Sequence, residues 1–333
     1  MEVSLLTAAI RCDNAGDAII ESAVTRLIAD ASFHRFPLLQ TLSDEEIDRI
    51  NRTDIAIICG TNLYQKTFNC SITEEIAKRI KVPIIPFGIG SSANIGEIPE
   101  MNAAGVAAVR AIHRKCGLSS VRDRASLRFL NSIGIENAVL TGCPVLFHGL
   151  GVPDFSVSGE GYTLTPRARL LHIDQKWQSR QMETLVSLAA TYRPKLVLQS
   201  PYDKPVAEPI AAALGLEMLW DEDWQAEPYV QAAKTQRMNF GFRLHFGMLS
   251  LAYGKPAYIV AHDSRVSEFC DLLALPRIDI TQYSDSDLMR LINNRSFDAD
   301  KFLGIWGELS GKMVSFMTSI GLRTNLVPER AAA

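Results

Sequence analysis

Arg243 and His245 flank Leu244 at the start of an apolar run whose pattern indicates a buried helix. The first turn of a helix presents free backbone N–H groups and the positive end of the helix dipole, so a cation there costs a few tenths to about 1 kcal/mol. An anion bound between the two side chains would offset that cost. The alternative is that Arg243 pairs with a carboxylate and that His245 is packed for structural reasons. The pattern favours the anion site.

A second group of polar side chains follows the next apolar run, which predicts a strand over residues 256–261. His262, Asp263 and Arg265 come directly after this strand, so they lie at one edge of the sheet. In open α/β sheets, ligands bind outside the carboxyl ends of the strands. We therefore expect these three side chains at the ligand-binding edge.

The loop after the first apolar strand carries Asn14, Gly16 and Asp17. Asn14 and Gly16 suit a tight turn. Asp17 is a good N-cap for the amphipathic helix that follows. Capping alone therefore explains Asp17 as well as a functional role does.

Two further strand ends carry glycines or charges. The loop 88–96 holds three glycines and two serines, enough to surround an anion with backbone N–H groups. It is neither a P-loop nor a full dinucleotide fingerprint, so its signal is weak. Arg122 and Asp123 follow another predicted strand, where an internal ion pair or a helix cap explains them as well as a function does.

Alternating strands and helices must position these residues, and the chain has two such series. The first predicts strands over 3–10, 54–60, 82–90, 118–123 and 138–142, with helices over 18–31, 72–80, 101–115 and 125–134. The second predicts strands over 169–174, 195–199, 217–220, 235–240, 256–261 and 277–280, with helices over 177–192, 204–214, 225–234, from 243, and over 264–273. Strands that are apolar throughout are typical of parallel sheets covered on both faces.

The segment 149–168 interrupts this rhythm with four glycines and two prolines, as expected of a linker. We therefore predict an α/β fold with two Rossmann-like, doubly wound domains that face each other across a cleft. The predicted parts are an N-terminal domain over 1–150, a linker over 151–165, a C-terminal domain over 166–297, and a C-terminal helix and tail over 298–333.

Composition excludes several classes of protein. The chain has 333 residues, of which 47% are hydrophobic and 21% charged, the mix of a soluble globular protein. A net charge of -3 gives no electrostatic reason to expect a nucleic-acid partner. The N-terminus lacks a basic region, and no apolar run approaches the roughly 20 residues that span a bilayer. The six cysteines are scattered, which argues against zinc and disulfides and favours the cytoplasm.

Five short elements, in this order and spacing, resemble the polysaccharide pyruvyl transferase family over roughly residues 3–275. They are Asn14-Ala15-Gly16-Asp17, Gly60-Thr61-Asn62, Gly88-Ile89-Gly90, Arg122-Asp123-Arg124-Ala125-Ser126, and Arg243-Leu244-His245 with Gly254-Lys255-Pro256. The R-L-H element is the most specific of them. The resemblance implies a fold similar to GT-B glycosyltransferases and the transfer of pyruvate from phosphoenolpyruvate onto a sugar as a ketal, in cell-surface polysaccharide biosynthesis.

The resemblance and the chemistry together assign three groups of residues, and no metal or cofactor. The expected catalytic residues are His245, Asp17 and Asp123; the donor-binding residues Arg243, Arg265, Gly88, Gly90 and Ser91; and the acceptor-binding residues Asn14, Arg122 and His262. The expected partners are phosphoenolpyruvate and an activated sugar or glycan, and a peripheral membrane contact is left open. Histidine suits proton transfer because its intrinsic pKa lies near neutrality.

The chain departs from the family pattern at three places. Cys143-Pro144 stands where members often have Asp-Pro, and Arg265 stands where a lysine is usual. An arginine expected at the start of the second domain has no clear counterpart among residues 170–177, where His172, Gln175 or Lys176 could substitute. A nucleotide-sugar glycosyltransferase and a catalytically silent sugar-binding relative remain the alternatives. The sequence determines neither the acceptor sugar nor the oligomeric state.

Overall fold

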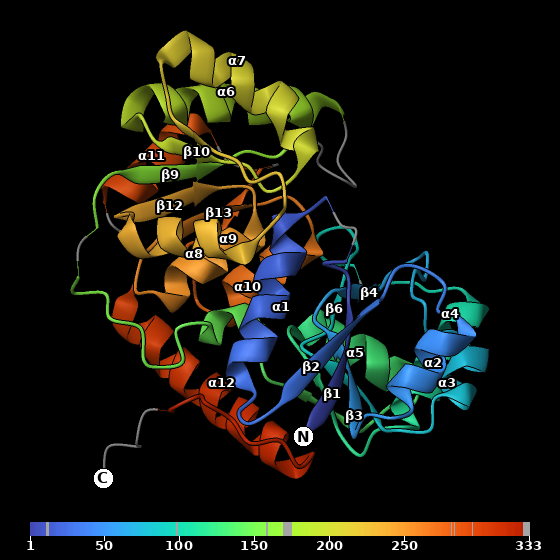
Figure 1. Cartoon of the computed structure of the whole chain (residues 1–333). Coiled ribbons are helices and arrows are strands. Elements are labelled where there is room, and N and C mark those ends of the chain that lie inside the picture. The colour runs from blue at the N-terminus through green and yellow to red at the C-terminus, as the bar shows by residue number, and fades with distance from the viewer. Residues whose placement is uncertain are drawn as a thin grey trace. The chain divides into compact units, whose positions relative to one another are not determined.

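The computed structural model describes residues 1–10, 13–97, 99–157, 159–168, 175–280, 282, 284–294 and 296–328, apart from the side chains of 175–178 and 285. The chain forms two compact units (Figure 1). The N-terminal unit comprises Met1–Cys12, Ile20–Gly151 and Gly307–Ala333. The C-terminal unit comprises Asp13–Ile19 and Val152–Trp306. The chain therefore passes between the units more than once, and the short segment 13–19 belongs to the second of them.

The N-terminal unit is built on a parallel sheet of four strands in the order β2-β1-β3-β5. These strands are β1 (Glu2–Thr7), β2 (Ser32–Pro37), β3 (Ile55–Cys59) and β5 (Ile84–Phe87). Two short parallel pairs accompany them: β4 (Asn62–Tyr64) with β6 (Gly90–Ser91), and β7 (Ser119–Val121) with β8 (Ala138–Leu140). Every residue of β3 is buried, as expected for a central strand with both faces covered.

Amphipathic helices supply the rest of the N-terminal core. They are α2 (Asp44–Ile50), α3 (Glu74–Arg79), α4 (Ala103–His113), α5 (Arg124–Ser132) and the 3₁₀ helix η1 (Pro144–Phe147). Local sequence sets their starts: Ser43 and Glu46 form a capping box before α2, and Asn102 caps α4. Two helices, α1 (Ala15–Leu27) and α12 (Ala299–Ser319), are shared between the units.

The C-terminal unit is built on a parallel sheet of six strands in the order β11-β10-β9-β12-β13-β14. The strands are β9 (Tyr162–Thr165), β10 (Lys195–Val197), β11 (Met218–Leu219), β12 (Met238–Gly241), β13 (Ala257–Ala261) and β14 (Ile278–Asp279). From β9 the chain first adds β10 and β11 on one side and then returns to add β12, β13 and β14 on the other. The strand order therefore reverses between β9 and β12, which is where open α/β sheets bind their ligands.

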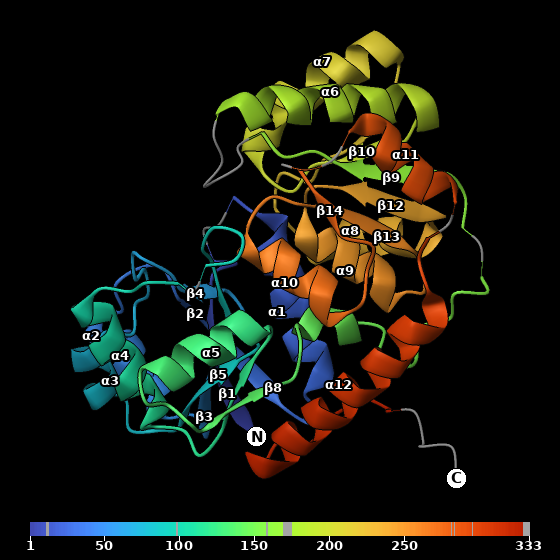
Figure 2. The ribbon, with the colours of Figure 1, turned by 180° about the vertical axis from the view of Figure 1, so that it is seen from behind.

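Helices cover both faces of this sheet, as Figures 1 and 2 show. They are α6 (Gln175–Tyr192), α7 (Lys204–Leu214), α8 (Ala226–Thr235), α9 (Leu244–Ala252), α10 (Ser264–Leu272) and α11 (Asp285–Asn293). Helices α6, α7 and α11 lie on one face, and α8, α9 and α10 lie on the other. Helix α9 is buried along most of its length, which explains why its sequence is almost entirely apolar.

The first strand of the C-terminal unit differs from the prediction. The segment 169–174, predicted as that strand, lies outside the described residues, and β9 occupies residues that the sequence indicates are a linker. Strand β9 lacks the continuous apolar pattern of a buried strand, because its buried residues include the polar Thr163 and Thr165. Thr163 Oγ1 donates a hydrogen bond to Asn239 Oδ1 at 3.0 Å, and this bond to β12 offsets the cost of burying the hydroxyl.

Candidate functional site

The turn from β12 into α9 is held tightly against the end of β9. Gly241 has φ +138°, and a Cβ there would lie 2.5 Å from the carbonyl oxygen of Thr165. Phe242 N and Arg243 N donate to the carbonyl and hydroxyl oxygens of Thr165 at 2.9 and 3.3 Å. Only glycine allows this approach, so the position of Arg243 is determined by the backbone.

Arg243 is the N-cap residue of α9, one residue before the first turn in which it was expected. Its Nη2 atom forms an ion pair with Asp203 Oδ1 at 2.5 Å. Asp203 is fully buried, and its Oδ2 accepts from the backbone N–H groups of Gln199 and Ser200, both at 3.1 Å. The carboxylate partner that the sequence left as an alternative is therefore real. Arg243 Nε is buried and has no hydrogen-bond partner among the described residues, so a donor is left for a ligand.

Arg167, two residues beyond the end of β9, brings a second guanidinium to this edge. Its Nη1 donates to His262 Nε2 at 2.7 Å, and His262 Nδ1 lies 3.1 Å from the carbonyl oxygen of Val260. Burial lowers the pKa of His262 to about 3 despite the neighbouring Asp263, so the ring is neutral near pH 7. A neutral ring donates through Nδ1–H to Val260 and accepts through Nε2 from Arg167.

A third guanidinium, that of Arg265, comes from the first turn of α10. Its Nε donates to Asp263 Oδ2 at 3.0 Å, while Asp263 Oδ1 caps the helix by accepting from Val266 N at 3.2 Å. Burial acts to raise the pKa of Asp263, but the Arg265 charge and its other cationic neighbours hold it well below its usual range. Burial, followed by the charges of Arg265 and Arg243, lowers the pKa of Arg167 to about 9.

We call these residues the arginine cluster: Arg167, Arg243, Arg265, Asp203, Asp263 and His262. Three guanidinium groups face two carboxylates and a neutral imidazole, which leaves one net positive charge in a largely buried setting. Such an arrangement favours an anion with several oxygen atoms, because each guanidinium can donate two parallel hydrogen bonds.

The N-terminus of α1 reaches the same unit and packs on His245. A Cβ at Gly16 would lie 2.8 Å from His245 Nδ1, so only glycine fits there without displacing the imidazole. Ala15 N donates to the carbonyl oxygen of Gln199 at 2.9 Å, which anchors the start of the helix beside the loop that follows β10. The structure therefore brings Ala15 and Gly16 together with the R-L-H element.

Asn14, rather than Asp17, caps α1. The helix begins at Ala15, and Asn14 Oδ1 accepts from Gly16 N at 3.1 Å. Asp17 lies in the first turn, where its Oδ2 accepts from Asn14 Nδ2 at 3.0 Å. The expected cap at Asp17 is wrong by three residues, because the helix starts earlier than the apolar pattern indicates. A carboxylate in the first turn is still favoured by the helix dipole.

The remaining predicted site residues belong to the N-terminal unit, and packing accounts for them. Arg122 is fully buried and donates to Asn62 Oδ1, and a Cβ at Gly90 would collide with its guanidinium. Gly88 has φ +66° and packs directly on Pro144. These glycines are explained by close approach, without an anion.

Asp123 and Ser91 are also explained by local structure. Asp123 Oδ1 caps α5 by accepting from Ser126 N at 2.7 Å, as the cap alternative anticipated. Ser91 is buried in the short strand β6. The roles assigned to the N-terminal residues remain predictions.

The sequence reasoning missed Arg167 and Asp203. Arg167 follows β9, in a segment whose composition indicates a linker, so the sequence pattern places no strand end before it. Of the substitutes considered, His172 lies outside the described residues, as do the side chains of Gln175 and Lys176. Asp203 follows β10, and the rule that ligands bind beyond strand ends would have found it.

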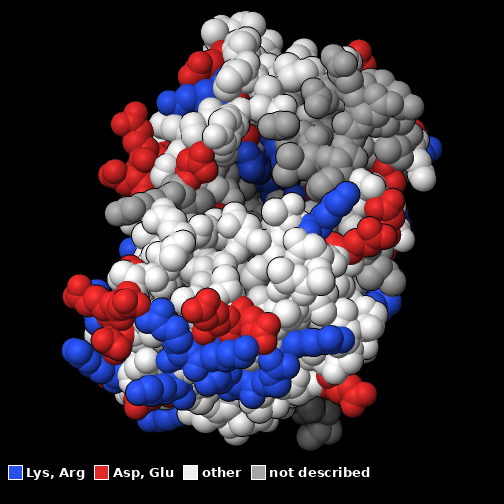
Figure 3. Space-filling view, turned by 90° about the vertical axis from the view of Figure 1, so that its right-hand side faces the viewer, with Lys and Arg blue, Asp and Glu red and all other residues white. Residues whose placement is uncertain are grey.

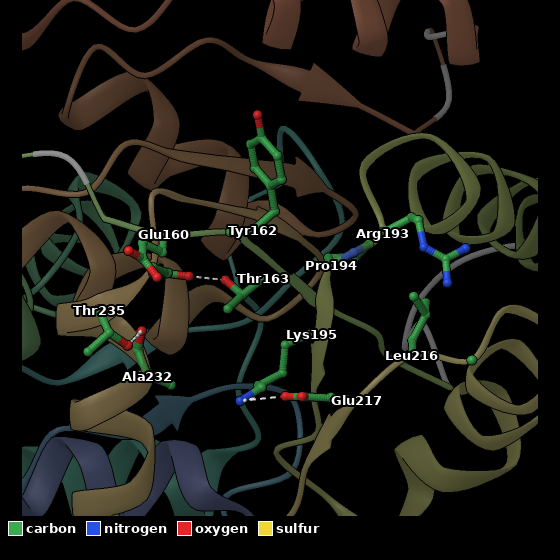
Figure 4. A pocket seen from close by; sticks show the side chains of 13 residues that line it. Glu160, Tyr162, Thr163, Arg193, Pro194, Lys195, Leu216, Glu217, Ala232 and Thr235 are labelled. Carbon is green, nitrogen blue, oxygen red and sulfur yellow. Dashed lines mark hydrogen bonds and ion pairs between the residues drawn. The ribbon is translucent and has the colours of Figure 1, made fainter.

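A cavity of about 350 Å³ lies elsewhere in the C-terminal unit, at the amino ends of β9 and β10 (Figure 4). Its charged side chains include Lys195 and Glu217, which form an ion pair at 2.9 Å. None of the residues lining it belongs to the arginine cluster. The cavity lies at the amino ends of the strands, whereas the arginine cluster lies beyond their carboxyl ends.

Charges on one face of the protein are segregated. On the face shown in Figure 3, Lys and Arg side chains gather in a band across the lower part, and Asp and Glu side chains lie directly above it and farther up at both sides. Among the described residues, no three or more His, Cys, Asp or Glu side chains gather in a way that could hold a metal ion. No described helix combines the length and apolar character needed to span a membrane.

Solved structures with a similar fold are sugar-nucleotide enzymes. A putative UDP-N-acetylglucosamine 2-epimerase from Listeria monocytogenes shares 11% identity, with 96% of this chain and 97% of that chain covered and a TM-score of 0.57. The UDP-GlcNAc 2-epimerase from Neisseria meningitidis, bound to UDP-GlcNAc, shares 12% identity, with 96% and 100% covered and a TM-score of 0.53. At such identities the likeness shows the fold alone. It confirms an α/β protein of two Rossmann-like units in the GT-B-like class.

The family comes from a different comparison. No curated protein sequence matches the chain. The model of the family described as polysaccharide pyruvyl transferase matches residues 14–264, a span that runs from the cap of α1 to the start of α10 and contains every member of the arginine cluster except Arg265. Because this match covers most of the chain, the protein belongs to the polysaccharide pyruvyl transferase family and is a transferase.

Proposed function

We propose that the protein transfers the enolpyruvyl carbon unit of phosphoenolpyruvate onto a sugar as a ketal, in the biosynthesis of a cell-surface polysaccharide. The arginine cluster supports this proposal most directly. Phosphoenolpyruvate carries a carboxylate and a phosphate, and three guanidiniums from the ends of β9, β12 and β13 offer donors for both groups.

Two buried donors strengthen the case for an anionic ligand. Arg243 Nε and Gln199 Nε2 are buried and have no hydrogen-bond partner among the described residues. Leaving a buried donor unsatisfied costs about 1–3 kcal/mol, so such groups usually serve a ligand or a water molecule. Both follow strands of the C-terminal sheet, on the edge that carries the arginine cluster.

The reaction needs a proton at the methylene carbon of the donor, and we assign its delivery to His245. Protonation converts the methylene to a methyl group and leaves cationic character at the carbon that bears the phosphate. One sugar hydroxyl attacks that carbon and gives its proton back to His245. A second hydroxyl of the same sugar then displaces the phosphate and closes the ketal, and its proton leaves with the phosphate.

The α1 N-terminus supports this assignment, because it fixes the imidazole through Gly16. Asp17 and Asn14 in the same turn are the side chains we assign to orienting the sugar hydroxyls. Phosphoenolpyruvate is a substrate in this scheme, and we propose no cofactor. The described cysteines are free thiols, in keeping with a cytoplasmic location as part of the proposal.

Phosphate release tests the proposal. The purified protein is incubated with phosphoenolpyruvate and a panel of free, nucleotide-linked and lipid-linked sugars, and phosphate and a mass gain of one pyruvyl ketal are measured. Arg243→Lys should weaken phosphoenolpyruvate binding in calorimetry, because a lysine cannot replace the bidentate fork and cannot hold the same geometry with Asp203. Release of a nucleotide with transfer of a hexose would instead identify a glycosyltransferase.

A further inference from the structure

Three side chains on the β10 and β11 side of the arginine cluster form a second arrangement, which the proposed reaction does not use. Trp220 follows β11, and its ring meets that of Trp224 edge to face, with centroids 4.6 Å apart and an interplanar angle of 84°. The Lys204 ammonium lies over the Trp220 ring, 3.9 Å from its centroid. We call Lys204, Trp220 and Trp224 the tryptophan platform.

The backbone and the polar atoms of this platform are unusual for a purely structural loop. Trp224 has φ +54°, a conformation that bulky residues rarely adopt and that recurs at ligand-binding sites. The indole Nε1 of Trp220 is buried without a hydrogen-bond partner in the described part of the chain. Close by in the sequence, Tyr202 is 66% exposed, which is high for an aromatic ring. Two indole rings, an ammonium group and a buried donor without a described partner thus occur together.

The platform stands beside the arginine cluster. Lys204 directly follows Asp203, whose carboxylate holds Arg243 at 2.5 Å. Strand β11, which leads into Trp220, is two positions from β9, which leads into Arg167. Neighbouring strands are about 4.8 Å apart, so the strand ends that lead into Trp220 and Arg167 are roughly 10 Å apart, while Lys204 is adjacent to the cluster.

We propose that the tryptophan platform binds the acceptor and that the acceptor is a glycosyl phosphate. The C–H face of a pyranose packs on an indole ring, because the ring face is negative and the C–H groups are weakly positive. The Lys204 ammonium pairs with the phosphate, and Trp220 Nε1 donates to a sugar oxygen. The inference rests on the proposed function, because only that function makes the bound sugar an acceptor. It places this acceptor on the β10 and β11 side of the arginine cluster, away from β13.

Calorimetry without phosphoenolpyruvate tests the proposal independently of turnover. The probes are the 1-phosphates of glucose, galactose, mannose and N-acetylglucosamine, the four free sugars, and UMP. We expect at least one sugar phosphate to bind about tenfold or more tightly than its free sugar. Lys204→Met should abolish that preference, and Trp224→Leu should weaken binding of the sugar phosphate about tenfold or more.

Lys195→Met is the matched control, because Lys195 lies at the amino edge of the same sheet and pairs with Glu217. It should leave sugar-phosphate binding unchanged. Melting temperature and phosphoenolpyruvate affinity are measured for each variant, so that loss of fold is separated from loss of the platform. A Lys204→Leu variant serves if Lys204→Met is unstable.

Three results would overturn the proposal: no binding of any sugar phosphate, unchanged binding in folded Lys204→Met, or UMP binding as tightly as the best sugar phosphate. The last result would assign the rings to a nucleobase. If a sugar phosphate does bind, its UDP-linked and short lipid diphosphate-linked forms are compared, and whichever binds more tightly identifies the natural source. Absence of phosphate release from phosphoenolpyruvate would reject the proposed function while leaving this binding result standing.

Discussion

His262 accepts a hydrogen bond from Arg167 across 2.7 Å, while the other nitrogen of its ring lies 3.1 Å from the carbonyl oxygen of Val260. A histidine that the sequence suggested for acceptor binding thus lies beneath a guanidinium, with its ring buried. We propose that His262 acts on a ligand only through Arg167, as a positioning residue, and this proposal leads to the first prediction.

Replacing His262 should affect donor binding more than chemistry. His262→Leu removes the acceptor for Arg167 Nη1, so the guanidinium loses its orientation and phosphoenolpyruvate affinity should fall about tenfold. The value of kcat should change by less than threefold. His262→Gln can still offer a side-chain oxygen, so it should recover most of the affinity. A fall in kcat at unchanged KM for the donor would contradict a positioning role.

Donor binding should weaken in alkaline solution. The pKa of Arg167 is lowered from 12.5 to about 9. The guanidinium is therefore charged well below pH 9 and loses its charge as the pH rises through about 9. A bound anion favours the charged form, so affinity should fall by up to tenfold per pH unit above about 9. The phosphate is already fully ionised there, because its second pKa is about 6. Calorimetry from pH 7.5 to 10 measures the effect, and a flat profile would remove Arg167 from the site.

Protein stability should decline in mildly acidic solution because of His262. Its pKa is about 3 in the folded chain and about 6.5 in an unfolded one, so only the unfolded state takes up the proton between these values. The contribution of His262 to the free energy of unfolding is therefore fully present above about pH 6.5. It falls by up to about 1.4 kcal/mol for each pH unit below that value. Urea unfolding at pH 7 and pH 5.5 measures this, and His262→Gln should show a shallower decline.

Gly16→Ala should impair turnover without unfolding the protein. The added methyl group would lie 2.8 Å from His245 Nδ1, so the imidazole must move away from the start of α1. We expect kcat to fall at least tenfold while the melting temperature changes by only a few degrees. The control is Gly304→Ala in α12, where a Cβ meets nothing within 4 Å. That variant should keep its activity and gain up to about 1 kcal/mol in stability. Normal turnover in Gly16→Ala would argue against a catalytic His245.

His245→Gln should separate an enzyme from a binding protein. If the imidazole carries the proton, turnover should fall by about 10²- to 10⁴-fold while the fold and much of the donor affinity remain. Single-turnover assays, calorimetry and thermal unfolding on one preparation provide the three readings. A lower melting temperature together with nearly normal turnover would make His245 a structural residue.

The sequence alone was sufficient to identify the fold class and the R-L-H element. Buried strands such as β3 and β13 are apolar throughout, because both of their faces are covered and no position faces water. This pattern can therefore be recognised from the sequence alone. The starts of helices α2 and α4 are likewise set by residues close in the sequence, because Ser43 and Asn102 cap them. The carboxyl ends of parallel strands then indicate where ligands bind in such sheets, and this rule points to Arg243 and Arg265.

Only the tertiary structure decided how these residues are used. Thr163 and Thr165 resemble linker residues until their partners on β12 are known, so β9 and Arg167 were missed. Asp203 and His262 acquire their roles from partners 40 and 95 positions away in the chain. Gly16 is required by His245, more than 200 residues later. Contacts of this kind depend on the packing of distant segments, and no local pattern in the sequence records them.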